Sequence, residues 1–347
     1  MKKERRIPVA IAVVLLILPI QYAINTAILT SFGHTMPNKL WILRTMFNFA
    51  NIAVLGLVAG VIVSAVRREF RYHLRVLRSW PWIATTFLLI VGVSVLGYEY
   101  GLLKITVHLV RNVNYDAILW EIDRWMMLGI SPNVFLLESL SHPVFYKTFD
   151  WLYAFGFAMT MFGSFVLLFG WRNNNDRIGY LAGSTVLWLS GAWLYLAVPS
   201  LGPAYAFYEV WDGVRHYFPV TNQVQKMLIE NHLLVRRLAE GERNLSIHIH
   251  LGIAAFPSLH VGFHAHFAFW LQRLVPRLRL LGWILLAIVF IGSVITGWHY
   301  VIDSIAGLIL GWLGWRVGAW VAGPRRSAAP PAADVAPVAA EEVAGGK

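Results

Sequence analysis

Long apolar runs, separated by short polar and basic segments, follow one another along most of the chain. A helix of about 20 apolar residues crosses the ~30 Å hydrocarbon core of a bilayer. By this measure the pattern predicts eight membrane-spanning helices, near residues 7–30, 46–66, 82–103, 149–170, 178–199, 254–272, 280–298 and 300–322. The pattern therefore predicts an all-α integral membrane protein.

Two segments between the spans have the pattern of amphipathic helices. The stretch NYDAILWEIDRWMMLG, residues 114–129, has apolar residues at helical spacing and acidic residues opposite them. This arrangement is typical of a helix that lies in the membrane interface, although an ordinary anchor helix with a solvated acidic face gives the same pattern. A second helical stretch, QVQKMLIENHLLVRRLAEGE, lies in the long connection from 200 to 252. We expect both helices on the external side.

The composition agrees with a membrane protein and excludes several other classes. Hydrophobic residues make up 58% of the chain and charged residues 14%, whereas soluble domains are about 45–50% apolar and about 25% charged. The net charge is +11, but the basic residues are scattered between apolar runs and form no continuous basic face, so we expect no nucleic-acid partner. The absence of cysteine excludes disulfides and thiolate chemistry.

The distribution of lysine and arginine predicts the orientation of the chain. Basic residues concentrate in MKKERR at the start and in the short segments after residues 66, 170, 272 and 322, whereas the opposite connections are longer and less basic per residue. The positive-inside rule then places both termini in the cytoplasm. The run after MKKERR is too long for a signal peptide, so we read it as an uncleaved first span. We divide the chain into two N-terminal helices (1–81), a catalytic membrane domain (82–322) and a disordered cytoplasmic tail (323–347) rich in alanine and proline.

The stretch FPSLH, at the start of the sixth predicted span, combines features of an anion site. Pro257 suits the beginning of a helix, because its missing N–H is not needed there. The free N–H groups of the first turn and the hydroxyl of Ser258 are suited to bind a phosphate, and Ser258 can also cap the helix. His260 lies in that first turn.

The stretch TGWHYVIDS, before the eighth predicted span, carries the second polar group. His299 and Asp303 are four residues apart, so that the carboxylate can fix the tautomer of the imidazole and leave its other nitrogen free to attack. Two neighbouring antiparallel spans would bring His260 to the same external end. We therefore expect phosphoryl transfer in which His299 attacks phosphorus, Asp303 orients it and His260 protonates the leaving oxygen. The scheme needs no metal and no cofactor.

These residues resemble the motifs of a known family. Pro257-Ser258-Leu259-His260 is similar to the second motif of the type 2 phosphatidic acid phosphatase superfamily, Pro-Ser-x-His, and His299-x3-Asp303 to the end of its third motif. The forms FPSLH and HYVID, together with YDAILWEIDRWMMLG, resemble the inositol phosphorylceramide synthase branch. The resemblance implies a six-helix core with an external site. It also implies the same three catalytic roles, with Ser258 as a phosphate contact.

The superfamily's usual phosphate-binding cations are not in their usual places. Val294 follows Ser293 where the third motif has arginine, and the segment AVPSLGPAYAF shows no Lys-x6-Arg-Pro first motif. We expect the cation to come from the long external loop, which offers Arg215, Lys226, Arg236, Arg237 and Arg243, and we choose Arg237. Tyr205 is a candidate for the head-group pocket, and Asp116 and Asp123 for binding a polyol.

Other histidines have simpler explanations. His264 and His266 follow His260 on the same predicted helix, where packing or lining a polar cavity is the favoured role. His248 and His250 alternate like ligands on a strand, but two histidines alone make a weak metal site.

Three functions fit the sequence, and they differ in class. The first is a lipid phosphotransferase that moves an inositol-phosphate-type head group from a phospholipid to a lipid alcohol, with membrane lipids as donor and acceptor. The second is a phosphatase of lipid phosphates or polyprenyl diphosphates. The third is a non-catalytic lipid transporter or binding protein.

Overall fold

The computed structural model describes residues 6–31, 40–242, 247–248, 250 and 251–324. The predicted tail beyond Pro324, the first basic residues and Arg243 lie outside the described residues. The described part is helical: α1 (Arg6–Ser31), α2 (Leu40–Val66), α3 (Phe70–Leu77), α4 (Trp80–Val110), α5 (Asp116–Met126), α6 (Pro132–Ser139), α7 (Pro143–Gly170), α8 (Asn174–Ala197), α9 (Pro203–Ala206), α10 (Tyr208–Asp212), α11 (Pro219–Ala239), α12 (Leu259–Leu274), α13 (Arg279–Ile295) and α14 (Val301–Ala322), with short 3-10 turns at Arg215–Tyr217 and Pro276–Leu278.

A long helix occupies each of the eight predicted span positions, and six of these are long and apolar enough to cross a membrane: α1, α2, α4, α7, α13 with the turn before it, and α14. The other two, α8 and α12, lie inside the bundle, where most of their residues are buried. Because α8 and α12 face other helices rather than lipid, they need less apolar character. The structure thus supports six spans by length and composition, not the full eight.

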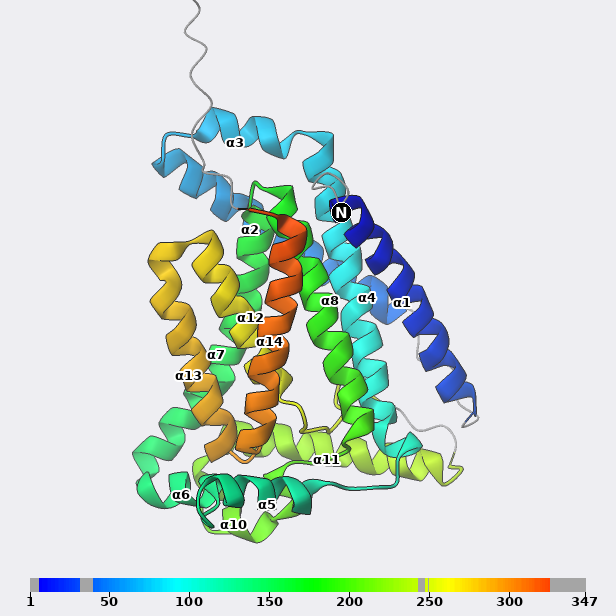
Figure 1. Cartoon of the computed structure of the whole chain (residues 1–347), viewed down its shortest axis with the longest axis vertical. Helices are drawn as coiled ribbons and strands as arrows, with labels where there is room; N and C mark the ends of the chain where they lie inside the picture. The colour runs from blue at the N-terminus through cyan, green and yellow to red at the C-terminus, as the bar shows by residue number, and fades with distance from the viewer. Residues whose placement is uncertain (1–5, 32–39, 243–246, 249, 325–347) are drawn as a thin grey trace, which may run out of the picture.

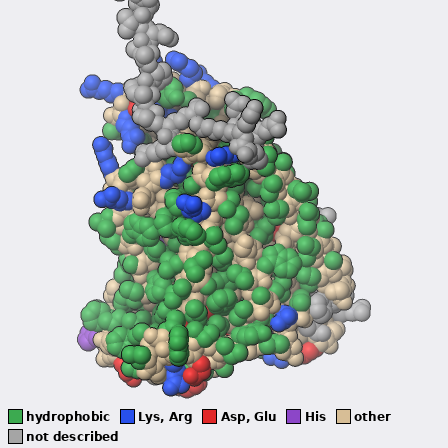
Figure 2. All heavy atoms as spheres, in the orientation of Figure 1, with side chains coloured by type: hydrophobic (Ala, Val, Ile, Leu, Met, Phe, Trp, Pro, Cys, Tyr) green, Lys and Arg blue, Asp and Glu red, His purple; other side chains and the backbone are tan. Residues whose placement is uncertain are grey.

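The helices at the eight predicted span positions run side by side, and the other helices lie at the two ends (Figure 1). At one end α3 lies across the bundle; at the other end lie α11, α5, α6 and α10, and α11 contacts α7 and α4. Hydrophobic side chains cover the middle of the visible surface, with lysine and arginine gathered towards the end of α3 (Figure 2). This is the surface of a multi-pass membrane protein. The predicted amphipathic helices in 114–129 and 223–242 correspond to α5 and α11.

Small residues allow α14 to lie close to both buried helices. A Cβ built at Gly307 or Gly311 would collide with backbone of Ser258 or Gly262 on the α12 side, and one at Gly314 would meet the backbone oxygen of Gly183 on α8 at 2.7 Å. Close backbone packing of this kind is common between helices in membranes. It fixes the N-terminal ends of α12 and α14, which carry the two histidine motifs, next to each other.

Candidate active site

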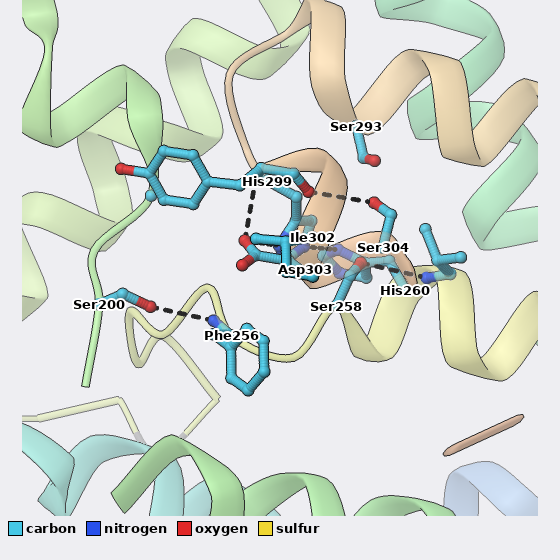
Figure 3. Close-up of polar contacts among 12 residues, drawn as sticks. Ser200, Phe256, Ser258, His260, Ser293, His299, Ile302, Asp303 and Ser304 are labelled. Carbon is cyan, nitrogen blue, oxygen red and sulfur yellow. Dashed lines mark hydrogen bonds and ion pairs between the residues drawn. The ribbon is translucent and has the colours of Figure 1, made fainter. Parts of the chain in front are cut away.

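His260 and His299 meet at the end of the bundle that α11 covers. Nδ1 of His260 lies 3.3 Å from Nε2 of His299. His299 comes from the turn between α13 and α14 and His260 from the first turn of α12 (Figure 3). The predicted approach of the two histidines through neighbouring helices is therefore present in the structure.

Asp303 contacts the other nitrogen of His299, as its spacing suggested. Its Oδ2 lies 3.4 Å from Nδ1 of His299 and accepts a hydrogen bond from the backbone N–H of Tyr300 at 3.0 Å. The route to this contact differs from the prediction, because His299 precedes α14 and is not part of it. Asp303 caps the first turn of the helix and, from there, reaches back to the imidazole. The orientation leaves Nε2 of His299 facing His260.

Backbone contacts hold the turn that carries His299. The backbone N–H groups of Trp298 and His299 both donate to the carbonyl of Ser293, at 3.0 and 3.1 Å. The side-chain amide of Asn133, on α6, donates to the carbonyls of Val294 and His299. The loop before α12 is held in a similar way, since Ser200 accepts from the N–H of Phe256 (Figure 3). Both histidines thus sit on a preorganised frame.

The environment keeps His299 unprotonated. Burial lowers the pKa of His299 to about 3, and the charge of Lys104 acts in the same direction. Only 4% of the residue is exposed. An unprotonated imidazole is the form that can attack phosphorus.

The two histidines open into a cavity of about 300 Å³. Lys104 is the only lysine or arginine among the described residues that line this cavity. Four tyrosines contribute polar groups: Tyr100, Tyr153, Tyr195 and Tyr205. Thr221 on α11 also lines the cavity, and Val220, Val224 and Leu228 of the same helix form an apolar wall. The cavity thus combines one positive charge with several hydroxyl groups and an apolar side.

Lys104 is the functional candidate that the sequence analysis missed. Its Nζ lies 5.9 Å from the ring centre of Tyr100 and 5.7 Å from that of Tyr195, which hold it within the cavity. Six residues separate Lys104 from Arg111, as in Lys-x6-Arg-Pro, with Asn112 in the place of proline. This spacing at the end of α4 was the signal for Lys104 in the sequence.

The cations expected from the external loop are engaged elsewhere or exposed. Arg237 pairs with Glu242 at the exposed end of α11 and does not line the cavity. Arg215 donates to the carbonyl of Ala204 and stacks on Tyr208. Lys226 and Arg236 are exposed on α11. The structure therefore does not bring Arg237 to the cavity that holds the histidines.

Of the two predicted substrate contacts Ser258 and Tyr205, Ser258 caps a helix and Tyr205 lines the cavity. Ser258 is fully buried, and its hydroxyl caps α12 by accepting from the N–H of Val261 at 3.3 Å (Figure 3). It does not line the cavity, so the structure places it in the capping role. Tyr205 does line the cavity, with its hydroxyl donating to the carbonyl of Gln225 and its ring edge-on to Trp298.

Asp116 and Asp123 accept hydrogen bonds from backbone groups near His299 and do not line the cavity. Asp123 accepts from the N–H groups of Val301 and Ile302, at 2.6 and 2.9 Å, which caps α14. Asp116 accepts from the N–H groups of Leu201 and Gly202 and from the hydroxyl of Tyr300. Both carboxylates are buried and line no part of the cavity. In place of the expected polyol contact, the two carboxylates join α5 to the backbone next to His299. We call this set of hydrogen bonds the carboxylate clasp.

Replacing Asp123 by asparagine tests the carboxylate clasp. Burial raises the pKa of Asp123 to about 6, so the group is ionised at neutral pH and accepts two charge-assisted bonds. An asparagine has a single acceptor oxygen, and we expect the free energy of unfolding to fall by roughly 2 kcal/mol. Turnover should fall as well, since His299 lies two residues from Val301. Thermal unfolding and activity in detergent would measure both effects.

The matched control is Glu121→Gln on the same helix. Glu121 is exposed and pairs only with Arg124, three residues further on, so this variant should unfold and react like the wild type. Equal unfolding temperatures for Asp123→Asn and Glu121→Gln would contradict the carboxylate clasp.

Together these features define a helical membrane protein with a paired-histidine site and one cation at the end of its bundle. The family model of the PAP2 superfamily matches residues 117–317, which is more than half of the chain, so the chain belongs to this superfamily. Its members are generally phosphatases and phosphotransferases, and membership indicates a lipid phosphatase or phosphotransferase type of activity. No curated protein and no solved structure gave a match.

Proposed function

We propose that this protein is a membrane lipid phosphotransferase that moves an inositol-phosphate-type head group from a phospholipid to a lipid alcohol. In the first step Nε2 of His299 attacks phosphorus, the bond from phosphorus to the lipid oxygen breaks, and His260 gives that oxygen a proton. In the second step His260 takes the proton of the acceptor hydroxyl, whose oxygen bonds to phosphorus, and the electron pair of the P–N bond returns to His299. The opposed nitrogens of His260 and His299 inside one cavity carry this proposal.

The charge of the cavity supports a phosphodiester donor. A phosphodiester has one negative charge, whereas a phosphomonoester approaches two near neutral pH. Lys104 is the one cation among the described cavity residues, and it matches the single charge of a diester. The lining hydroxyls of the tyrosines and Thr221 suit a head group with several hydroxyls of its own.

The position of α11 supports transfer over hydrolysis. This helix crosses the end of the bundle (Figure 1) and contributes an apolar wall to the cavity. Its N-terminus is fixed by Asp150 of α7, which accepts from the N–H groups of Val220 and Thr221 at 2.9 and 2.8 Å. A covered, partly apolar site limits the access of water to a reactive intermediate.

The topology belongs to the same proposal. The helices α1, α2, α4, α7, α8, α12, α13 and α14 cross the membrane, and residues 82–322 form the catalytic domain. Both termini and α3 are cytoplasmic. The cavity opens on the external side. The basic character of α3, with Arg71 and Arg75, supports this orientation under the positive-inside rule.

Single cysteines can test the topology, because the chain has none of its own. A cysteine at Glu121, on the exposed face of α5, should react in intact cells with a maleimide that cannot cross membranes. A cysteine at Arg75, on α3, should react only after permeabilisation. The opposite pattern of labelling would contradict the proposed orientation.

The activity itself can be measured on purified protein in detergent. The protein is incubated with phosphatidylinositol, with and without an acceptor, which is ceramide or a diacylglycerol whose acyl chains differ in mass from those of the donor, and products are followed by mass spectrometry. A new inositol-phosphate lipid that needs both the acceptor and His299 would support transfer. Free inositol phosphate alone would replace the proposal by hydrolysis of this donor.

A further inference from the structure

The segment from the end of α2 to the start of α4 carries five arginines and one acidic residue. The arginines are Arg67, Arg68, Arg71, Arg75 and Arg78. All five are exposed, and none pairs with an acidic side chain within the described part of the chain. The acidic residue, Glu69, is already paired with Arg172 at 2.6 Å. Positive charge at this end of the protein is therefore uncompensated (Figure 2).

Three of these arginines lie on the side of α3 that faces away from the bundle. Arg71, Arg75 and Arg78 are four and three residues apart, which is the spacing of one helical face. His73 lies on the opposite side and is only 2% exposed. A Cβ added at Gly60 of α2 would lie 3.0 Å from its Nε2, so this side of α3 packs against α2. The arginine face is left open to an outside partner.

Short connections hold α3 at the level of the lipid head groups. Only residues 67–69 separate it from α2, and only residues 78–79 separate it from α4, and both neighbours are long and apolar enough to cross a membrane. Val66 and Trp80, at the ends of these two helices, are 80% and 76% exposed. Apolar and aromatic side chains of this kind favour the boundary between head groups and acyl chains. The arginines between them therefore lie at the depth of the phosphates.

We propose that Arg71, Arg75 and Arg78, with Arg67 and Arg68 beside them, bind the head groups of anionic phospholipids. A guanidinium group binds two phosphate oxygens at once, which a point charge does not. Each arginine near an anionic membrane surface strengthens binding by about fivefold. This site lies at the opposite end of the bundle from α11 and the cavity (Figure 1), and it does not depend on the proposed chemistry. In the proposed orientation the lipids belong to the cytoplasmic leaflet.

Lipid binding can be measured by native mass spectrometry on the full chain in detergent, titrated with phosphatidylglycerol or with phosphatidylcholine. The variant Arg71→Gln/Arg75→Gln/Arg78→Gln should lose at least about tenfold in affinity for phosphatidylglycerol, because three such contributions are removed. Its affinity for phosphatidylcholine should not change. Its unfolding temperature without lipid should equal that of the wild type, since these side chains have no partner in the described part of the protein. Higher ionic strength should weaken the binding of phosphatidylglycerol to the wild type.

The matched control is Lys226→Gln/Arg236→Gln/Arg237→Gln, which removes three exposed positive charges from α11 at the opposite end. This variant should keep the wild-type affinity for phosphatidylglycerol. An equal loss in the two triple variants, or no loss in the α3 variant, would overturn the proposal. A wild type that binds both lipids equally would overturn it too. Displacement of phosphatidylglycerol by an equal concentration of glycerol phosphate would show a site for free anions and would also overturn the lipid assignment.

Discussion

Replacing His299 by alanine should lower turnover by roughly 10⁴-fold or more, because the first covalent bond to phosphorus forms at its Nε2. The residue lies in a turn whose backbone contacts to Ser293 and Asn133 do not involve its side chain, so the fold should survive the change. The variant should still bind phospholipid. Activity by mass spectrometry and the unfolding temperature, measured on the same preparation, separate loss of chemistry from loss of structure.

His248→Ala is the control for this variant. His248 is exposed and does not line the cavity, so its replacement should leave turnover unchanged. A His299→Ala protein that keeps more than a few per cent of wild-type activity would contradict the nucleophile assignment. A His299→Ala protein that moves lipid as well as the wild type, while neither makes product, would favour the non-catalytic transporter.

Replacing Lys104 by glutamine should lower kcat/KM by about 100-fold, which is the usual cost of removing one group that stabilises transition-state charge. Lys104 supplies the only positive charge among the described cavity residues, and its loss leaves the phosphate without a counter-ion. The pH profile should change as well. The charge of Lys104 helps to lower the pKa of His299, so its removal raises that pKa and moves the acid limb of kcat/KM to higher pH.

Lys226→Gln and Arg237→Gln are matched controls for charge. Both side chains are exposed on α11, outside the cavity lining, and both variants should keep the wild-type kcat/KM and pH profile. If Arg237→Gln loses activity while Lys104→Gln does not, the phosphate-binding cation has been assigned to the wrong residue.

Much of the architecture could be predicted, because hydropathy reports the environment of a helix. All eight long helices were located within a few residues at most ends, and the amphipathic pattern found α5 and α11. Hydropathy gives no measure of burial within the bundle. It therefore could not distinguish α8 and α12, which are surrounded by other helices, from the helices that face lipid. The short helices α6, α9 and α10 were missed, since four to eight residues give too little periodicity.

The proximity of His260 and His299 could be predicted because it depends on local motifs at the ends of adjacent helices. His260, His299 and Asp303 needed only spacing and sidedness to be placed together. A cap was expected only for Ser258, and the backbone contacts of Asp116 and Asp123 were not expected, since a carboxylate or hydroxyl that binds backbone N–H groups looks the same in sequence as one that binds a ligand. Which backbone N–H groups need a partner depends on the tertiary packing.

Lys104 was not expected in the cavity, although the structure places it there. It lies near the end of a long apolar run and reads as an ordinary flanking charge of a span. Its position in the cavity results from the packing of α4 against α8, where the rings of Tyr100 and Tyr195 lie near its amine. Distances between α4 and α12 are not encoded in the hydropathy pattern, so the spacing of Lys104 to Arg111 was the one local signal for this cation.

The most direct test of the account is to look for the covalent intermediate. Purified protein is mixed with phosphatidylinositol without acceptor, quenched at alkaline pH to preserve phosphohistidine, and its peptides are analysed by mass spectrometry. We predict an inositol-phosphate adduct on the peptide that contains His299, present in the wild type, absent in His299→Ala and lost when acceptor is added. Turnover of the lipid without an adduct on this peptide, or an adduct on another residue, would contradict the mechanism.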